Sequence, residues 1–210
     1  MSEEFSYTWQ GEGGVRIRVT VEPSMIQANA CRFVVEPPLY PEGGAHFTRG
    51  GDVESPLAEA LLARGDISEV LIGGSTVTIT TDDAQDWATY GEKVATAIRD
   101  QINSGTPAVS QTFTESLPSP DVIREQVQQI IDEAVNPAVA GHGGSVTLLD
   151  VRGNNVFLEF GGGCQGCAMS LVTLKFGVER LLRERVPKIG QILDTTDHAA
   201  GANPYYAPST

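Results

Sequence analysis

The first half of the chain contains several short segments with the pattern of β-strands. Residues 15–21 alternate apolar and polar side chains, which is the period of a half-buried strand. A second strand is expected over residues 31–35. Residues 36–54 contain three prolines and four glycines, so we expect a long surface loop there. Residues 70–72 and 77–81 flank a glycine-containing turn and predict a hairpin.

Two helices are expected among these strands. Ser55 followed by Pro56 is typical of a helix N-terminus, and Gly65 ends that helix. A longer helix is expected over residues 86–102. Its apolar positions recur at helical spacing and predict one inward stripe, formed by Tyr90, Val94, Ala97, Ile98 and Ile102.

The second half predicts a helix, two strands and another helix. Ser119 and Pro120 repeat the helix-start pattern, and we expect Pro137 to stop this helix. Residues 146–151 and 156–160 predict a second hairpin. A helix of about four turns follows, with an apolar stripe of Leu171, Leu174, Val178, Leu181 and Leu182. A short edge strand is expected over residues 189–193.

This order of elements predicts an α+β protein with two small two-layer domains. The first is expected over residues 1–103 and the second over residues 120–194, with the order α-β-β-α-(β). Residues 104–119 are rich in Ser, Thr, Pro and Gly without a regular period, so we expect a mobile interdomain linker. Residues 195–210 are expected to form a loose tail.

Charge narrows the possible partners. The 210 residues have a formal net charge of -13. Residues 1–110 hold seven basic and sixteen acidic side chains, a net of -9, and residues 111–210 hold seven and eleven, a net of -4. Such acidity argues against nucleic acid or an anionic membrane as the main partner. No run approaches the roughly twenty apolar residues of a membrane span.

The cysteines and the first residues favour a reducing compartment. Three cysteines do not make a disulfide framework, and an accessible thiol pair stays reduced most readily in the cytoplasm. The first residues have neither the basic and apolar regions of a signal peptide nor the composition of a transit peptide. We therefore expect a cytoplasmic protein.

Cys164 and Cys167 are the candidate functional residues. They stand three positions apart, after Gly161, Gly162 and Gly163 and before the last predicted helix. Glycines let the backbone come close to a ligand, and a helix N-terminus favours the thiolate form. The pair therefore predicts soft-metal or redox chemistry.

The spacing alone leaves three possibilities, which are a metal or cluster site, a dithiol redox pair and an incidental spacing. The functional alternatives to a cluster site are a thiol-disulfide oxidoreductase and a zinc-stabilised interaction module. The flanking residues lack the aromatic residue and proline of a thioredoxin-like motif. Tetrahedral zinc needs two further ligands in the chain. We leave Cys31 and His142 off the ligand list, because Cys31 is expected inside a strand and His142 in a turn between glycines.

Motifs in both halves of the chain resemble one family. In the second half these are Asn136 with Pro137, the glycine pair at 143–144, and the run from Gly161 to Cys167 before a long helix. From about residue 121 to 194 the chain resembles the NifU C-terminal domain of the Nfu family of iron-sulfur cluster carriers. His142, and the tail residues His198, Tyr205 and Tyr206, resemble the bacterial NfuA-type branch.

The first half also resembles this family. Residues 15–101 are similar to the Nfu N-terminal domain in the segment from Ser55 to Ala58, in the hairpin with Gly73 and Gly74, and in the helix with Trp87.

The resemblance implies a carrier rather than an enzyme. It implies that Cys164 and Cys167 are the ligands and that a homodimer shares one 4Fe-4S cluster. Two thiolates from each chain supply the four that such a cluster takes. The family then implies upstream cluster assembly proteins as donors and apo iron-sulfur proteins as recipients, with the first domain selecting them. We expect no catalytic residue.

Overall fold

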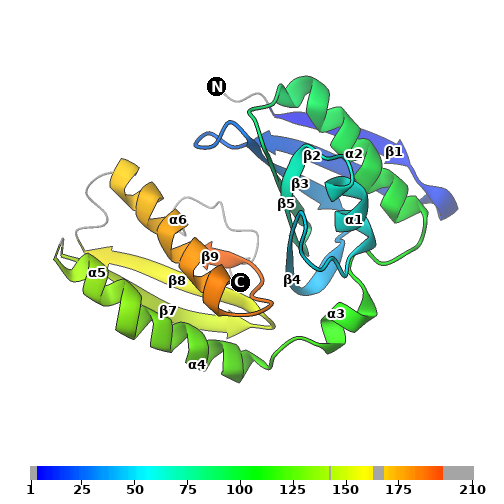
Figure 1. The fold of residues 1–210 in the computed structure, drawn as a ribbon. Helices are drawn as coiled ribbons and strands as arrows, with labels where there is room; N and C mark the ends of the chain where they lie inside the picture. The colour runs from blue at the N-terminus through cyan, green and yellow to red at the C-terminus, as the bar shows by residue number, and fades with distance from the viewer. Residues whose placement is uncertain (1–3, 142, 163–167, 196–210) are drawn as a thin grey trace, which may run out of the picture. The chain divides into compact units, whose positions relative to one another are not determined.

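The computed structural model describes residues 4–141, 143–162 and 168–195. The chain divides into two compact units, Met1–Leu117 and Pro118–Thr210. Each unit contains both helices and a sheet, so the α+β class is confirmed (Figure 1).

The first unit contains an antiparallel sheet with strand order β1-β2-β3-β6-β5-β4. Its strands are β1 (Phe5–Gln10), β2 (Arg16–Pro23), β3 (Ala30–Glu36), β4 (Tyr40–Thr48), β5 (Ile67–Gly74) and β6 (Thr76–Thr81). Its helices are η1 (Glu12–Gly14), α1 (Pro56–Leu62), α2 (Trp87–Asn103) and α3 (Gln111–Glu115). The hairpin expected over residues 70–81 is confirmed as β5 and β6.

One face of this sheet makes the core of the first unit. Val21 pairs with Phe33, Phe33 with Val77, and Val77 with Ile72, so one row of apolar side chains crosses four strands. All four side chains are fully buried. The alternation along each strand places its apolar residues on this face, where α1 and α2 cover them (Figure 1).

Side-chain caps fix where the helices of this unit begin. The Ser55 hydroxyl accepts a hydrogen bond from Ala58 N at 3.0 Å, and Pro56 occupies the first turn of α1. Asp86 caps α2 by accepting from Ala88 N. The sequence predicted the first start from its capping residue and the second from the helical spacing of residues 86–102. Both caps satisfy backbone donors that the helix leaves free.

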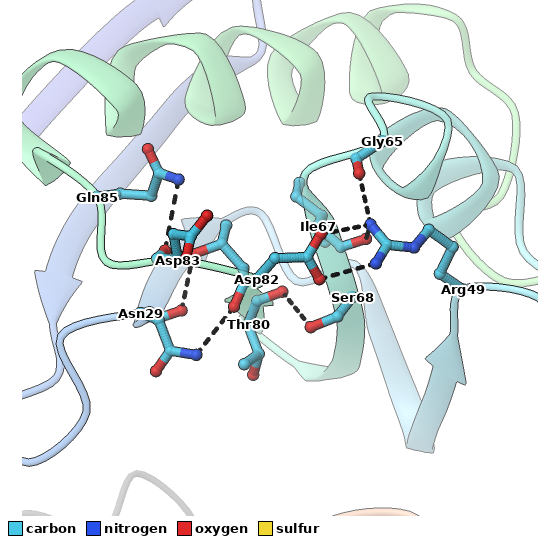
Figure 2. Close-up of polar contacts among 10 residues, drawn as sticks. Asn29, Arg49, Gly65, Ile67, Ser68, Thr80, Asp82, Asp83 and Gln85 are labelled. Atoms are coloured by element: carbon cyan, nitrogen blue, oxygen red, sulfur yellow. Dashed lines mark hydrogen bonds and ion pairs between the residues drawn. The ribbon is translucent and has the colours of Figure 1, made fainter.

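A polar cluster fastens one end of the sheet to the turn that precedes α2. The Arg49 guanidinium, just after β4, donates to both carboxylate oxygens of Asp82 at 2.7 and 2.9 Å, and to the Gly65 carbonyl. Figure 2 shows these contacts of Arg49. Nearby, the Asn29 amide donates to the Thr81 carbonyl at 2.8 Å. Arg49 therefore holds three chain segments together, and its hydrogen bonds lower the pKa of Asp82.

Two expectations for the first half were wrong. Residues 36–54 contain strand β4 rather than only a loop, because Ala45 and Phe47 are buried and pair with Ile72 and Val70. One proline and two glycines fall at an irregularity between Tyr40 and Gly44, which hides the alternating pattern, and the other prolines and glycines lie before or after the strand.

The expected linker also differs in the structure. Residues up to Leu117 belong to the first unit, and Ala108, Val109 and Phe113 are buried in its core. The Ser110 hydroxyl caps α3 by accepting a hydrogen bond from Phe113 N. The centres of the Phe113 and Phe47 rings lie 5.3 Å apart. The segment contains only a few buried side chains and is too short to show a periodic pattern. Its composition alone therefore suggested a linker.

The second unit has helices on one face of a three-stranded sheet, with order β7-β8-β9 (Figure 1). Its elements are α4 (Pro120–Ile130), η2 (Ile131–Val135), α5 (Asn136–Ala140), β7 (Gly144–Arg152), β8 (Asn155–Gly162), α6 (Ala168–Arg185) and β9 (Ile192–Asp194). Ile123 and Val127 of α4 and Val178 and Leu182 of α6 share one core with Leu158 of β8. This arrangement confirms the expected hairpin and both long helices.

Pro137 does not stop the helix, contrary to expectation. The chain passes from α4 through the π-helical turn Ile131–Val135 into α5, and Pro137 lies in the first turn of α5. Proline lacks an N–H donor, and the wider π turn lets the backbone continue without that hydrogen bond. The helical segment therefore reaches Ala140.

The short edge strand expected over residues 189–193 is present as β9, which covers Ile192–Asp194 and pairs parallel with β8. The Asn154 side chain donates to the Lys188 carbonyl at 2.7 Å, and Asn155 Oδ1 accepts from Gln191 N at 2.8 Å. These bonds tie the β7–β8 turn to the segment between α6 and β9. Residues 196–210, most of the expected tail, lie outside the described residues.

Candidate functional site

Strand β8 and helix α6 bracket the segment that contains both candidate ligands. β8 ends at Gly162, α6 begins at Ala168, and Cys164 and Cys167 lie outside the described residues between them. The site is therefore described through the elements that deliver the chain to it and receive the chain from it.

The glycines at the end of β8 lie against the start of β7. Gly162 pairs with Gly144, and Gly161 pairs with Ser145. A Cβ placed on Gly161 would lie 2.8 Å from Ser145 Oγ, closer than side-chain atoms normally approach. Glycine at position 161 thus leaves room for the Ser145 hydroxyl beside the strand end that leads to the cysteine segment.

The turn between α5 and β7 faces the same end of the hairpin. Gly143 N donates to the Ala140 carbonyl at 2.9 Å, and Gly143 has a φ of 68°, which favours glycine. His142, one of the residues on which the resemblance to the NfuA-type branch rests, lies outside the described residues.

Asn136 is a residue of this region whose contact the sequence did not predict. Its Nδ2 donates to the Val146 carbonyl at 3.1 Å, and its Oδ1 accepts from Val146 N at 2.8 Å. Val146 pairs with Phe160, two residues before Gly162. Asn136 was singled out only as part of a motif with Pro137, because no periodicity reveals a side chain that bonds to backbone groups ten residues away.

Two basic side chains of helix α6 bind neighbouring segments of the second unit. Lys175 forms an ion pair with Asp194 of β9, and its ammonium lies 5.7 Å from the centre of the Phe160 ring. Near the other end of the helix, Arg183 pairs with Glu179 and donates to the Gly190 carbonyl at 2.9 Å. These contacts fix the helix that starts one residue after Cys167.

Cys31 is separate from this site. The residue belongs to β3 of the first unit and is 1% exposed. Burial is the main cause that raises the pKa of its thiol to about 12, so the thiol stays protonated at neutral pH. A protonated buried thiol is a poor metal ligand, which agrees with the expectation that Cys31 is a core residue.

Histidine adds no metal site in the described part of the chain. His46 Nε2 lies 3.2 Å from Glu69 Oε2, in the first unit. Across residues 4–141, 143–162 and 168–195, no three His, Cys, Asp or Glu side chains form a group that could hold a metal ion. His198, Tyr205 and Tyr206 lie outside this part of the chain.

Among the described helices, none combines the length and the apolar character that crossing a bilayer requires.

Two family models match the chain, one in each half. The model of the scaffold protein Nfu/NifU N terminal matches residues 24–105, and that of the NifU-like domain matches residues 127–193. The first range lies in the unit Met1–Leu117 and the second in the unit Pro118–Thr210. The NifU-like match includes Asn136, the β7–β8 hairpin, both cysteines and α6.

The chain is also similar to curated proteins named Fe/S biogenesis protein NfuA. Those of Pseudomonas savastanoi pv. phaseolicola and Pseudomonas syringae pv. syringae are 47% identical over 88 residues, which is 40% of this chain and 45% of theirs. The protein of Pseudomonas aeruginosa is 47% identical over 85 residues, or 44% of its length. The chain thus spans less than half the length of these relatives.

The N-terminal model matches the first half of the chain and the NifU-like model matches the second half. The chain belongs to the Nfu/NifU-like family of iron-sulfur cluster carriers.

Proposed function

We propose that this chain carries a 4Fe-4S cluster on Cys164 and Cys167 and delivers it to apo iron-sulfur proteins. The observation that carries the proposal is the position of the two cysteines in the NifU-like domain. They follow the glycines that end β8 and directly precede α6. The cluster is cargo in this proposal, and the thiolates hold it until an acceptor takes it.

The number of thiolates supports a cluster shared by a homodimer. A 4Fe-4S cluster usually takes four cysteine ligands, and the segment supplies two per chain. Cys31 does not add a third, since its thiol is buried in the first unit and protonated. Two chains related by a twofold axis would supply the required four.

Cluster release follows from the same arrangement. A cluster held between two chains loses half its ligands when the chains separate, and thiols of an acceptor then replace them. The exchange needs thiolates, and a helix N-terminus lowers the pKa of a nearby cysteine. It needs no catalytic residue, so we propose a carrier without enzymatic activity.

We propose that upstream assembly proteins load the cluster, and that the first unit selects the acceptor. The acidity of the first half favours acceptors with a basic surface, which predicts that added salt weakens binding. Free thiolates are best maintained in a reducing compartment, so we propose the cytoplasm, without nucleic acid or membrane as partner.

Anaerobic reconstitution with iron and sulfide tests the proposal. We expect a broad absorbance band near 400 nm, and about two iron and two sulfide per chain. A Cys164→Ser, Cys167→Ser protein should remain colourless, whereas Cys31→Ala should load like the parent protein. The loaded protein should also activate an apo 4Fe-4S enzyme in the presence of an iron chelator.

The same samples separate the alternatives. A reversible dithiol couple without iron would favour an oxidoreductase, and stoichiometric zinc would favour an interaction module. Either result would contradict the proposed carrier function.

A further inference from the structure

We infer that Asn136 is a positioning residue for the cysteine segment, because its side-chain amide fixes the start of β7 against the glycine end of β8. The inference rests on the proposed function, since the property that Asn136 would control is how long the cluster stays bound.

The Asn136 carboxamide bonds to the backbone of Val146 as a peptide group of a further strand would. β7 is an edge strand with β8 on one side. On its other side, Val146 N–H donates to Asn136 Oδ1 at 2.8 Å, and Val146 C=O accepts from Asn136 Nδ2 at 3.1 Å. A carboxamide carries both a donor and an acceptor, so this side chain satisfies both backbone groups.

This contact determines which way the neighbouring backbone groups point. In an antiparallel pair, successive residues direct their N–H and C=O groups alternately toward and away from the partner strand. Since those of Val146 point to Asn136, those of Ser145 are directed toward Gly161, its partner in the register. Asn136 thus holds the register one residue pair away from the glycines.

The glycine end of β8 continues directly into the candidate ligands. Gly144 pairs with Gly162, and Gly162 precedes Cys164 by two residues. Without the Asn136 contact, two backbone groups at the start of β7 would lose their partners. We expect this end of the hairpin to open more often, which would release the chain that leads to Cys164.

Asn155 provides a matched control at the other end of the same hairpin. It pairs with Arg152, where β7 ends and β8 begins, and it is 7% exposed. Its Oδ1 accepts from Gln191 N at 2.8 Å, so this asparagine side chain also binds backbone. Strand geometry places it roughly 25 Å from the glycine end. Asn155→Ala therefore disturbs the same domain away from the cysteines.

The experiment compares reconstituted full-length protein with the variants Asn136→Ala and Asn155→Ala. The first readout is the decay of the cluster absorbance after addition of EDTA, and the second is the visible circular dichroism of the bound cluster. We expect both variants to lower the midpoint of thermal unfolding of the apoprotein. Only Asn136→Ala should change the dichroism and release the cluster faster, by about tenfold. Equal decay rates and spectra for the two variants would overturn the inference.

Two additions keep the test decisive. If Asn136→Ala does not fold, Asn136→Asp replaces it, because aspartate retains the acceptor for Val146 N–H. This variant should release the cluster faster than the parent protein, by less than the tenfold expected for Asn136→Ala. A release rate equal to the parent's would contradict the inference. Amide hydrogen exchange of the apoprotein gives a readout without iron. Asn136→Ala should speed exchange near Ser145 and Gly161, and Asn155→Ala should not.

The two proposals fail in different ways. If the parent protein does not take up iron, the carrier function fails, while the exchange experiment still tests whether Asn136 holds the hairpin. If the parent and both variants hold the cluster equally long, the positioning role fails and the carrier function stands.

Discussion

Ser145 Oγ lies 2.8 Å from the point where a Cβ on Gly161 would sit, beside the segment that leads to Cys164. We predict that Gly161→Ala lowers the free energy of unfolding, because the added methyl group crowds this oxygen. The loss should be only about 1 kcal/mol, since Ser145 is exposed and its hydroxyl can rotate away. Adding Ser145→Ala removes the crowding atom and should recover most of this loss. Urea unfolding of the single and double variants measures the coupling, and additive losses would contradict the contact.

Phe113 tests whether the segment before residue 117 is part of the first unit. The residue is 4% exposed, and the centre of its ring lies 5.3 Å from the centre of the Phe47 ring. Phe113→Ala should lower the free energy of unfolding by about 3 kcal/mol, because truncating a buried aromatic residue leaves a cavity. Thr112→Ala, at the exposed neighbouring position, should change it by less than about 0.5 kcal/mol. A linker would show no loss for either variant.

Ser55 links the start of α1 to the same segment. Its hydroxyl donates to the Ala108 carbonyl and accepts from Ala58 N, and the residue is 2% exposed. Ser55→Ala should cost about 2 kcal/mol, because it removes a cap and leaves a buried carbonyl without this donor. Ser119→Ala, the exposed cap of α4, should cost less than about 1 kcal/mol. Similar losses in thermal unfolding would show that the Ala108 contact contributes nothing.

The carboxylate of Asp150 predicts a pH dependence. Hydrogen bonds from Arg152 at 2.8 Å, and also from Arg124 at 2.9 Å, lower its pKa below the ordinary value of 3.8. The unfolded chain then binds this proton more readily, so the stabilisation is complete above pH 3.8 and is lost as pH falls through the lower, folded pKa. Asp150→Asn should reduce the loss of stability in acid, measured by unfolding at pH 6 and at low pH.

Glu125→Gln is the control for this prediction, since Glu125 is an exposed carboxylate on the same helix as Arg124. It should leave the acid dependence close to that of the parent protein. An equal effect of the two substitutions would mean that the Asp150 ion pairs do not couple protonation to folding.

The sequence predicted the elements whose patterns are regular over many residues. The alternation in residues 15–21, the cap at Ser55, and the hairpins that became β5–β6 and β7–β8 all depend on neighbours within a few positions. Local spacing also identified the glycines before Cys164. The family matches agree with the resemblance found from these motifs.

The elements that the sequence did not predict depend on contacts between distant residues. β4 is a strand because Phe47 pairs with Val70, although prolines and glycines interrupt its pattern. Phe113 is buried because Phe47 is beside it. The role of Asn136 depends on Val146, and the helix continues past Pro137 because a π turn precedes it. None of these partners can be read from one segment alone.

Native mass spectrometry of the anaerobically reconstituted protein tests the central claim most directly, because it weighs the chains and the bound cluster together. We predict one species with the mass of two chains, four iron and four sulfide, which disappears in the Cys164→Ser, Cys167→Ser protein. An iron-free monomer, or a cluster that remains bound to the protein without these cysteines, would contradict a cluster shared through Cys164 and Cys167.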